Sequence, residues 1–173
     1  MAEEAQNNNA QAPQAAPENA QPEVAFQLQR CYLKDASIEM PGAPKLFLEA
    51  PKSQPQVDLQ FEVSVHHFAP LHEICVRATV TIKAGEDVLT IVEGKQAGIF
   101  VIDGLDEAQM RTVCNVACPS IIYPYLRANI ADMLSRTSMS PVHLPEMDFA
   151  GLYAQRQAQA AEEAAKAAAP AQA

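Results

Sequence analysis

The sequence predicts an α+β fold in which a four-stranded antiparallel sheet carries long helices on one face. Apolar residues alternate with polar ones through the first half of the chain, as in half-buried strands. After Asp103 and Gly104 the apolar period becomes that of helices. Turn residues between the last three strand segments are few, which indicates short connections. Strands followed by helices, rather than alternating with them, are typical of the α+β class.

The strand pattern occurs in four segments. The first covers residues 24 to 35, where apolar side chains alternate with small or polar ones. The clearest alternation runs from 57 to 65, and 74 to 82 repeats it. The sequence Ala-Gly-Glu-Asp at 84 to 87 is a turn that leads into the fourth strand, residues 88 to 102. The short connections among the last three strands predict an antiparallel meander.

The fourth strand differs because apolar residues occupy both of its alternate faces. A strand of this kind needs cover on both sides. The helices that follow are sufficient for one face, so we expect a second subunit to cover the other. The interface residues expected on this strand are Val92, Gly94 and Gln96. Gly94 and Gly98 are interpreted as sites of a bulge or of close approach by another backbone.

Helical spacing dominates the second half. A first helix begins after Asp106 and Glu107, whose charges suit the N-terminal end of a helix dipole. Pro119 is expected to restart a longer helix, with Pro124 marking a kink or its true first turn. A last helix begins at Phe149. The apolar stripe of the long helix consists of Ile122, Leu126, Ile130, Met133 and Leu134.

The chain is expected to contain one domain, residues 23–153, between two tails. Residues 1–22 contain too little apolar side chain to offset the entropy of ordering and are expected to be disordered. Residues 154–173 are alanine-rich and are expected to form the end of a helix and a tail. Neither a signal sequence nor a long apolar span is evident, so we expect a cytoplasmic protein that does not insert into membranes.

The charge balance favours some partners and excludes others. Asp and Glu number 21 against 12 Lys and Arg, which gives a formal charge of −9. Nucleic-acid binding requires cationic surface, so we exclude it. An acidic surface favours cationic protein segments as partners.

Candidate metal and catalytic residues have weak support. His66, His67 and His72 look like a cluster, but neighbouring strand side chains point to opposite faces and no further ligand has suitable spacing. Cys114 and Cys118 share a helix face, and with Cys31 and Cys75 they are best interpreted as buried free thiols. No motif for acyl transfer, nucleotide hydrolysis or dinucleotide binding occurs. We therefore expect no metal, no cofactor and no enzymatic activity.

The aromatic and apolar residues suggest a peptide-binding groove. Leu46, Phe47 and Leu48 lie in a proline-rich connection that is too irregular for a helix and too apolar for an ordinary exposed loop. Tyr123 and Tyr125 flank Pro124 at the start of the long helix. A loop against this helix edge would bind extended peptide through apolar contact and backbone hydrogen bonds. The alternative is that each of these residues belongs to the core.

Residues 24–153 resemble SecB, the family of protein-export chaperones of Gram-negative bacteria. The resemblance is carried by FQLQRCYLKDASIEMPGAP (26–44), QAGIFVIDGL (96–105), CPSIIYPYLRANIADMLSR (118–136) and PVHLPEMDFAGLYAQR (141–156). It implies a homotetramer, a dimer of dimers, that binds unfolded precursor proteins without ATP and passes them to the SecA motor.

The resemblance also assigns sites. The client groove maps onto the five residues named above, Leu46, Phe47, Leu48, Tyr123 and Tyr125. SecA docking maps onto the outer face of the sheet at Asp35, Glu39, Ile91 and Glu93, and the C-terminal helix is a further SecA contact. Two alternatives remain: a SecB-like partner that controls one toxin–antitoxin pair, and a small-molecule enzyme with a closed polar cavity.

Overall fold

The computed structural model describes residues 24–49, 53–140 and 142–168. Its centre is a four-stranded antiparallel sheet in the order β1-β4-β3-β2, which confirms the predicted fold class. The strands are β1 (Ala25–Glu39), β2 (Gln56–Phe68), β3 (Leu71–Ala84) and β4 (Asp87–Asp103). The predicted disordered tail, residues 1–22, lies outside the described residues.

The last three strands form the predicted meander, whereas β1 reaches β4 across the sheet. Gly85 has a φ of 68° in the turn between β3 and β4, a conformation that glycine adopts without strain. β1 pairs with β4 although β2 and β3 separate the two in sequence. The pairing is interrupted by register shifts between Leu28 and Arg30 and between Leu33 and Asp35. β4 is therefore a central strand, hydrogen-bonded to a neighbour along each edge.

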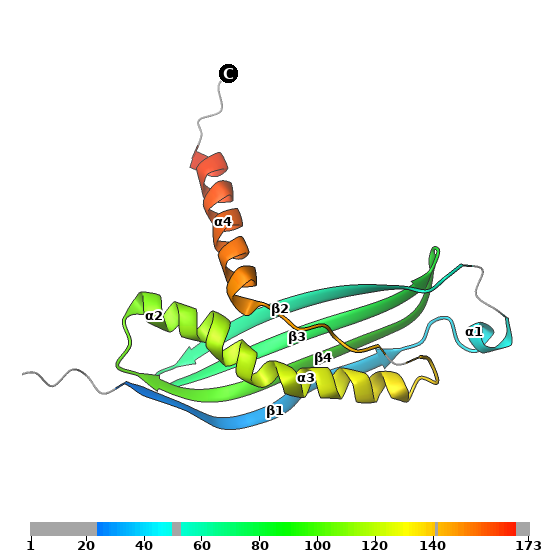
Figure 1. Ribbon diagram of the computed structural model, residues 1–173, viewed down its shortest axis with the longest axis horizontal. Coiled ribbons are helices and arrows are strands. Elements are labelled where there is room, and N and C mark those ends of the chain that lie inside the picture. Colours follow the sequence, from blue (N-terminus) through cyan, green and yellow to red (C-terminus); the bar gives the residue numbers. More distant parts are fainter. Residues whose placement is uncertain (1–23, 50–52, 141, 169–173) are drawn as a thin grey trace, which may run out of the picture.

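In the part of the chain that the structure describes, four α-helices accompany the sheet: α1 (Lys45–Leu48), α2 (Glu107–Thr112), α3 (Cys118–Ser135) and α4 (Phe149–Ala168). α3 lies along one face of the sheet, and α4 projects away from it (Figure 1). α2 begins with a capping box in which Asp106 and Gln109 each accept a hydrogen bond from the other's backbone N–H. The predicted stripe of α3 is buried along its whole length, at Ile122, Leu126, Ile130, Met133 and Leu134.

The long helix α3 begins at Cys118, next to Pro119, as predicted, but the chain does not leave the helical conformation before it. A π-helical segment, η1 (Val113–Ala117), joins α2 to α3 without a break, and the N–H of Cys118 donates to the carbonyl of Val113. A proline ring clashes with the carbonyl four residues earlier in a regular helix. We infer that the wider turn gives the Pro119 ring room. Pro124 lies inside α3, beyond the first turn.

The proline-rich connection also contains a turn of helix that its sequence did not predict. In α1 the N–H of Phe47 donates to the carbonyl of Pro44, and the N–H of Glu49 donates to that of Lys45. Pro44 itself has helical backbone angles. Proline is tolerated at the start of a helix, where its missing N–H is not needed. The segment is thus one helical turn rather than an irregular loop.

Two glycines of β4 allow α3 to approach the sheet. A Cβ atom at Gly98 would lie 2.8 Å from Cγ2 of Ile122, and one at Gly94 would lie 3.0 Å from Cδ1 of Ile130. Real Cβ atoms almost never come within 3.0 Å of another heavy atom. The close neighbours are therefore side chains, those of α3 at both positions and that of Phe100 at Gly98, and not the backbone that the sequence suggested.

Val92, Gly94 and Gln96, the residues expected at an oligomer interface, lie on the same α3-covered face. Val92 has no exposed surface and Gln96 is 3% exposed. The side chain of Asn129 in α3 donates to Oε1 of Gln96 at 2.8 Å. Because their own chain encloses these side chains, the expectation of direct contact with another subunit is corrected. They can influence an oligomer only through the elements they contact, among them α3 and β1.

The cysteines are free thiols, as the sequence indicated. Cys75, Cys114 and Cys118 are buried, and Cys31 is half-buried. Burial raises the pKa of the Cys118 thiol to about 12, with a further contribution from the neighbouring Cys114. A thiol in this state is protonated at neutral pH and unreactive.

Candidate interaction surfaces

The four residues assigned to docking lie together on the face of the sheet opposite α3. Residues paired across antiparallel strands share a face, and Glu39 pairs with Ile91 while Asp35 pairs with Lys95. Glu93 is two residues from Ile91 and shares its face. We call this surface the open face. The structure therefore brings Asp35, Glu39, Ile91 and Glu93 onto one surface formed by β1 and β4.

Glu93 is held by two neighbours from β3. Its Oε2 atom accepts a hydrogen bond from the hydroxyl of Thr79 at 3.0 Å and lies 3.1 Å from Nε of Arg77. The same guanidinium lies 3.5 Å from Oε2 of Glu62 on β2. Glu62, Arg77 and Glu93 thus form an ionic row across three strands, with a net charge of −1.

The open face has mixed charge rather than the uniform acidity that the sequence suggested. Arg77 and Lys95 lie among its carboxylates, because strand register places Lys95 opposite Asp35 and Arg77 opposite Glu62. The acidic residues on this face include Asp35, Glu39, Asp58, Glu62 and Glu93. A cationic partner segment would therefore meet ion pairs that already exist, and not an unbroken acidic surface.

A second polar cluster on the open face was not predicted. Nζ of Lys34 lies 2.7 Å from Oε2 of Glu73, and the Tyr32 hydroxyl donates to the same carboxylate. These contacts cross β4 above Ala97, whose methyl group leaves room for them. Hydrogen bonding from Lys34 and Tyr32 lowers the pKa of Glu73. The hydrogen bond to Glu73 raises the pKa of Tyr32 to about 12. The cluster ties β1 to β3 beside the irregularity that precedes Asp35.

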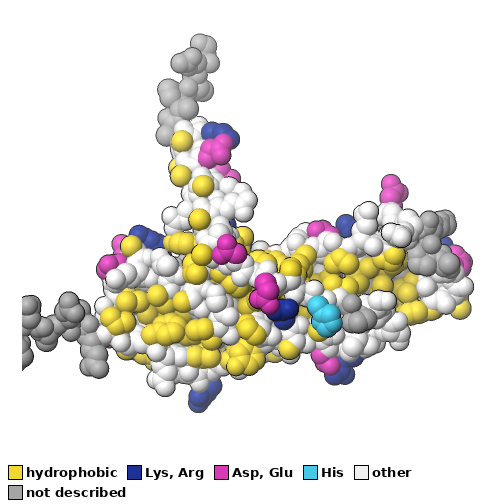
Figure 2. All heavy atoms as spheres, viewed as in Figure 1, with side chains coloured by type: hydrophobic (Ala, Val, Ile, Leu, Met, Phe, Trp, Pro, Cys, Tyr) yellow, Lys and Arg dark blue, Asp and Glu magenta, His cyan; other side chains and the backbone are white. Residues whose placement is uncertain are grey.

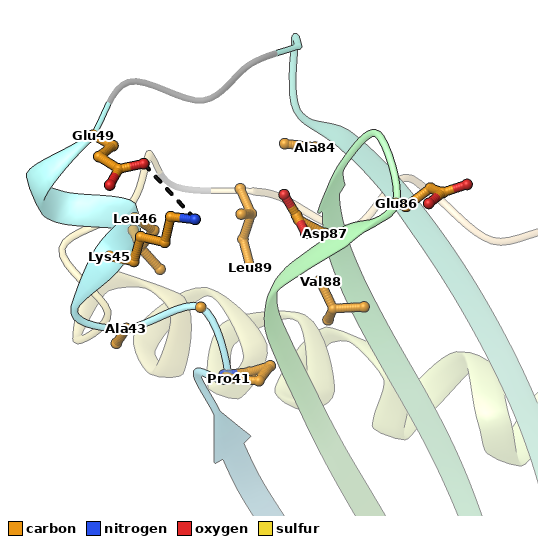
Figure 3. A pocket seen from close by; sticks show the side chains of 11 residues that line it. Pro41, Ala43, Lys45, Leu46, Glu49, Ala84, Glu86, Asp87, Val88 and Leu89 are labelled. Atoms are coloured by element: carbon orange, nitrogen blue, oxygen red, sulfur yellow. Dashed lines mark ion pairs between the residues drawn. The ribbon is translucent and has the colours of Figure 1, made fainter.

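The apolar residues of α1 lie at one end of the sheet. Leu46 lines a cavity of about 420 Å³ between α1 and the β3–β4 turn, where its side chain lies toward Leu89 (Figure 3). Phe47 is 52% exposed and Leu48 is 79% exposed. An ion pair between Lys45 and Glu49, 3.8 Å apart, lies at the rim. This end therefore offers a hollow lined by both charged and apolar side chains, with two exposed large apolar side chains beside it.

The two tyrosines of α3 have different environments. Tyr123 is 4% exposed, packs edge-on against Phe61 and Phe149, and donates a hydrogen bond to the carbonyl of Pro145 at 2.6 Å. Burial raises the pKa of Tyr123. Tyr125 is 52% exposed. Tyr123 is therefore a core residue, the alternative that the sequence left open, and Tyr125 is a surface residue.

The structure does not bring the five predicted groove residues together. From Tyr125 to the end of α3 is about 15 Å of helix, and α1 lies at that far end (Figure 1). None of the tyrosines of α3 lines the cavity beside Leu46. The single groove is corrected to two separate apolar areas, one at α1 and one around Tyr125.

The area around Tyr125 contains residues that the sequence argument missed. Ile121 is one helical turn before Tyr125 and is also exposed. Asn129, one turn later, bonds to Gln96, which in turn contacts Cys31 of β1. This flank of α3 therefore faces β1. Exposed apolar residues of β1 on the α3 side complete what we call the β1–α3 strip, defined by Phe26, Leu33, Ile38, Ile121 and Tyr125. Alternation placed Phe26 on a strand but could not show that it stays uncovered.

Hydrophobic side chains are visible on the helix-bearing side of the molecule over the helices and over the sheet (Figure 2). Single exposed apolar residues are ordinary on protein surfaces, whereas contiguous areas mark interaction sites. Several of the exposed large apolar residues, including Phe26, Ile121 and Tyr125, lie on this helix-bearing side, whereas Phe68 lies on the open face. The molecule presents two chemically different surfaces.

The histidines form a pair rather than a cluster of three. His66 and His67 lie on opposite faces of β2, and His67 is opposite His72 on β3. Their Nδ1 atoms are 2.8 Å apart. Such a contact needs one protonated and one unprotonated nitrogen. Among the described residues no group of three His, Cys, Asp or Glu side chains is placed to hold a metal ion.

The contact between His67 and His72 predicts that acid destabilises the folded state. Burial is the largest cause that lowers the pKa of His72, and the charge of His67 lowers it further. A hydrogen bond with the Ile102 backbone acts in the opposite direction. The folded state then binds fewer protons than the unfolded state, whose pKa is about 6.5. The free energy of unfolding should therefore decrease as the pH falls through about 6.5. NMR titration should give His72 a pKa below that value, partly restored by His67→Gln. A His72 that titrates at 6.5 or above would contradict the prediction.

Comparison with known proteins identifies relatives over most of the chain. A model of the family SecB, preprotein translocase subunit, matches residues 17–160. The protein-export protein SecB of Methylibium petroleiphilum is 47% identical over 142 residues, 81% of this chain and 86% of the relative. That of Ralstonia nicotianae is 48% identical over 140 residues, 80% of each chain.

A solved structure has the same fold. The SecB-like chaperone of Mycobacterium tuberculosis, in complex with a ChAD peptide from the HigA1 antitoxin, matches with a TM-score of 0.59. The match covers 70% of this chain and 90% of that one at 18% identity. At this identity the likeness shows the fold alone.

Separate ionic and apolar surfaces on an α+β scaffold define a protein that acts by binding other proteins. The chain belongs to the SecB family of protein-export chaperones. Members of this family are chaperones and not enzymes. Within the described residues, no helix is long and apolar enough to cross a membrane.

Proposed function

We propose that this chain is a cytoplasmic holdase that binds unfolded precursor proteins without ATP and delivers them to SecA. The observation that carries the proposal is the exposed apolar surface at α1 and along the β1–α3 strip, in a member of the SecB family. A protein that binds the unfolded state in preference to the native state competes with folding by mass action. Slow-folding precursors are captured, and fast-folding proteins escape.

The two apolar areas fit one extended client segment. An extended chain covers about 3.3 Å per residue, so five residues span the 15 Å from Tyr125 to the end of α3. A segment of roughly ten residues would then reach Phe47 and Leu48 as well. Contacts of this kind are apolar and unselective, as a chaperone with many clients requires. Several weak sites on one particle would raise the effective concentration of the next segment.

Removing the two exposed aromatic side chains should weaken client capture. The double substitution Phe47→Ala with Tyr125→Ala removes large apolar groups that are each about half exposed, so the folded state should lose little stability. We expect affinity for an unfolded client to fall about tenfold or more, since anchoring aromatic residues are each typically worth over 1 kcal/mol. Calorimetry with a denatured client measures the change.

The matched control for this variant is His143→Ala, because His143 is also exposed but lies outside both apolar areas. Sedimentation velocity should show that neither protein changes its assembly state. Unchanged client affinity in the double variant would remove Phe47 and Tyr125 from the client-binding surface.

For docking, we propose that SecA binds the open face at Asp35, Glu39, Ile91 and Glu93. Ile91 is partly exposed among charged neighbours, an arrangement that combines an apolar contact with ion pairs. A cationic segment of SecA is the expected occupant, and binding should weaken as salt rises. The C-terminal helix α4, which projects from the sheet (Figure 1), is proposed as a further contact.

We also propose a homotetramer, a dimer of dimers. The β1 side of the strip supports it, because Phe26, Leu33 and Ile38 are exposed apolar side chains on an edge strand and are suited to contact another subunit. Ile121 and Tyr125 of α3 stay available to a client. Val92, Gly94 and Gln96 would act indirectly by fixing the position of α3. Sedimentation equilibrium of the full chain distinguishes a tetramer from a dimer or a monomer.

The test of the proposed function is refolding interference. A stoichiometric amount of the purified chain should delay the refolding of an unrelated slow-folding protein in the absence of nucleotide. Failure to delay refolding of several such proteins, with tight binding to one folded partner instead, would favour a dedicated binding module.

A further inference from the structure

We infer that Thr79 is a positioning residue for docking, because it orients the Glu93 carboxylate so that one oxygen faces the partner. The inference rests on the proposed docking function of the open face. Thr79 belongs to β3 and is not among the residues that the family resemblance assigned to SecA. Its position opposite Glu93 follows from the β3–β4 register.

The geometry separates the two oxygens of Glu93. Oε2 accepts a hydrogen bond from the Thr79 hydroxyl at 3.0 Å and forms an ion pair with Nε of Arg77 at 3.1 Å. Within the described part of the chain, Oε1 has no donor. A carboxylate oxygen accepts about two hydrogen bonds. Oε2 therefore already has a hydrogen bond and an ion pair, and Oε1 is the oxygen whose acceptor positions are both left for a ligand.

The neighbouring charges decide which ligand fits. Arg77 also contacts Glu62 at 3.5 Å, so the row of Glu62, Arg77 and Glu93 keeps one negative charge. An ammonium or guanidinium group of the partner would neutralise that charge and donate to Oε1. Arg77 does not have to leave, because it contacts Glu93 through Oε2.

Holding the carboxylate in one orientation before binding has an energetic consequence. A glutamate side chain loses rotamer freedom when it binds a partner, and this loss opposes binding. Thr79 and Arg77 restrict Glu93 in the free protein, so less freedom is lost on docking. Thr79 makes this contribution without carrying charge, which allows its role to be separated from electrostatic attraction.

The experiment measures SecA affinity of the full chain for Thr79→Val, which removes the hydroxyl but keeps shape and strand propensity. We expect a loss of about three- to tenfold, with an unchanged slope of log affinity against log salt because no charge is altered. Thr79→Ser retains a hydroxyl and should restore affinity. The matched control is Thr81→Val, because Thr81 shares the strand and the face but lies opposite Ile91.

Glu93→Gln and the double variant with Thr79→Val complete the design. If Glu93→Gln leaves SecA affinity unchanged, the docking surface itself is wrong. If Glu93→Gln weakens binding while Thr79→Val does not, only the role of Thr79 is overturned. The role of Thr79 is also overturned if Thr79→Val lowers SecA affinity by the same factor in the Glu93→Gln protein as in the unmodified protein. The effect of the hydroxyl would then not depend on Glu93.

Discussion

Glu93→Lys is expected to abolish docking of SecA while leaving capture of unfolded clients intact. The substitution removes the carboxylate that lies 3.1 Å from Arg77 and places a second cation beside that guanidinium. A cationic partner segment would then meet like charge. Loss of one partner from a close charge pair at an interface costs about 2–5 kcal/mol, so affinity should fall at least about 30-fold.

Calorimetry with SecA and with a denatured client measures the two activities separately. Glu107→Lys is the matched control, because Glu107 also pairs with an arginine, Arg111, but lies on α2 and outside the open face. We expect the control to keep its SecA affinity, since the row of Glu62, Arg77 and Glu93 is unchanged. If Glu93→Lys removes both activities or neither, the assignment of the open face to SecA fails.

Phe100→Ala is expected to destabilise the fold more than any surface change. Phe100 has no exposed surface and stacks on Phe26 with ring centroids 5.8 Å apart. Its ring occupies the space that a Cβ atom at Gly98 would need, so the ring is closely packed. Truncating a buried phenylalanine costs about 3–5 kcal/mol, a large part of the stability of a domain.

Equilibrium unfolding in urea gives the change in the free energy of unfolding. Phe47→Ala provides the control, because Phe47 is 52% exposed and its loss should change stability by less than about 0.5 kcal/mol. Comparable destabilisation by the two substitutions would mean that Phe47 is a core residue in the assembled protein. Comparing Phe100→Ala with Phe47→Ala therefore also tests whether the apolar surface at α1 is exposed.

Much of the fold could be predicted from periodicity. Alternation in residues 57–65 and 74–82 identified two strands and the faces of their side chains, because a strand repeats every two residues. The stripe from Ile122 to Leu134 identified the buried side of α3 for the corresponding reason. The Ala-Gly-Glu-Asp turn identified the β3–β4 connection. These are local properties, and local sequence determines them.

The candidate site was predicted less completely. Asp35, Glu39, Ile91 and Glu93 were assigned from the family resemblance, and strand register places them on one face. Tyr123 and Tyr125 were treated alike, yet they lie on different flanks of α3. A helix turns by about 100° per residue, so two residues separated by one position cannot share an environment. Which of them is buried depends on where Phe61 and Phe149 lie.

The sequence by itself determined the fold class, the four strands, the buried stripe of the long helix and the family. Only the tertiary structure decided which face of β4 lies beneath α3, and hence that Val92, Gly94 and Gln96 are enclosed while Glu93 is open. Periodicity divides residues between two faces but does not say which face meets the helix, because that choice comes from the non-local pairing of β1 with β4 and from packing against α3. The tertiary structure also decided which residues contact Glu93, because the register of β3 against β4 places Thr79 and Arg77 beside it.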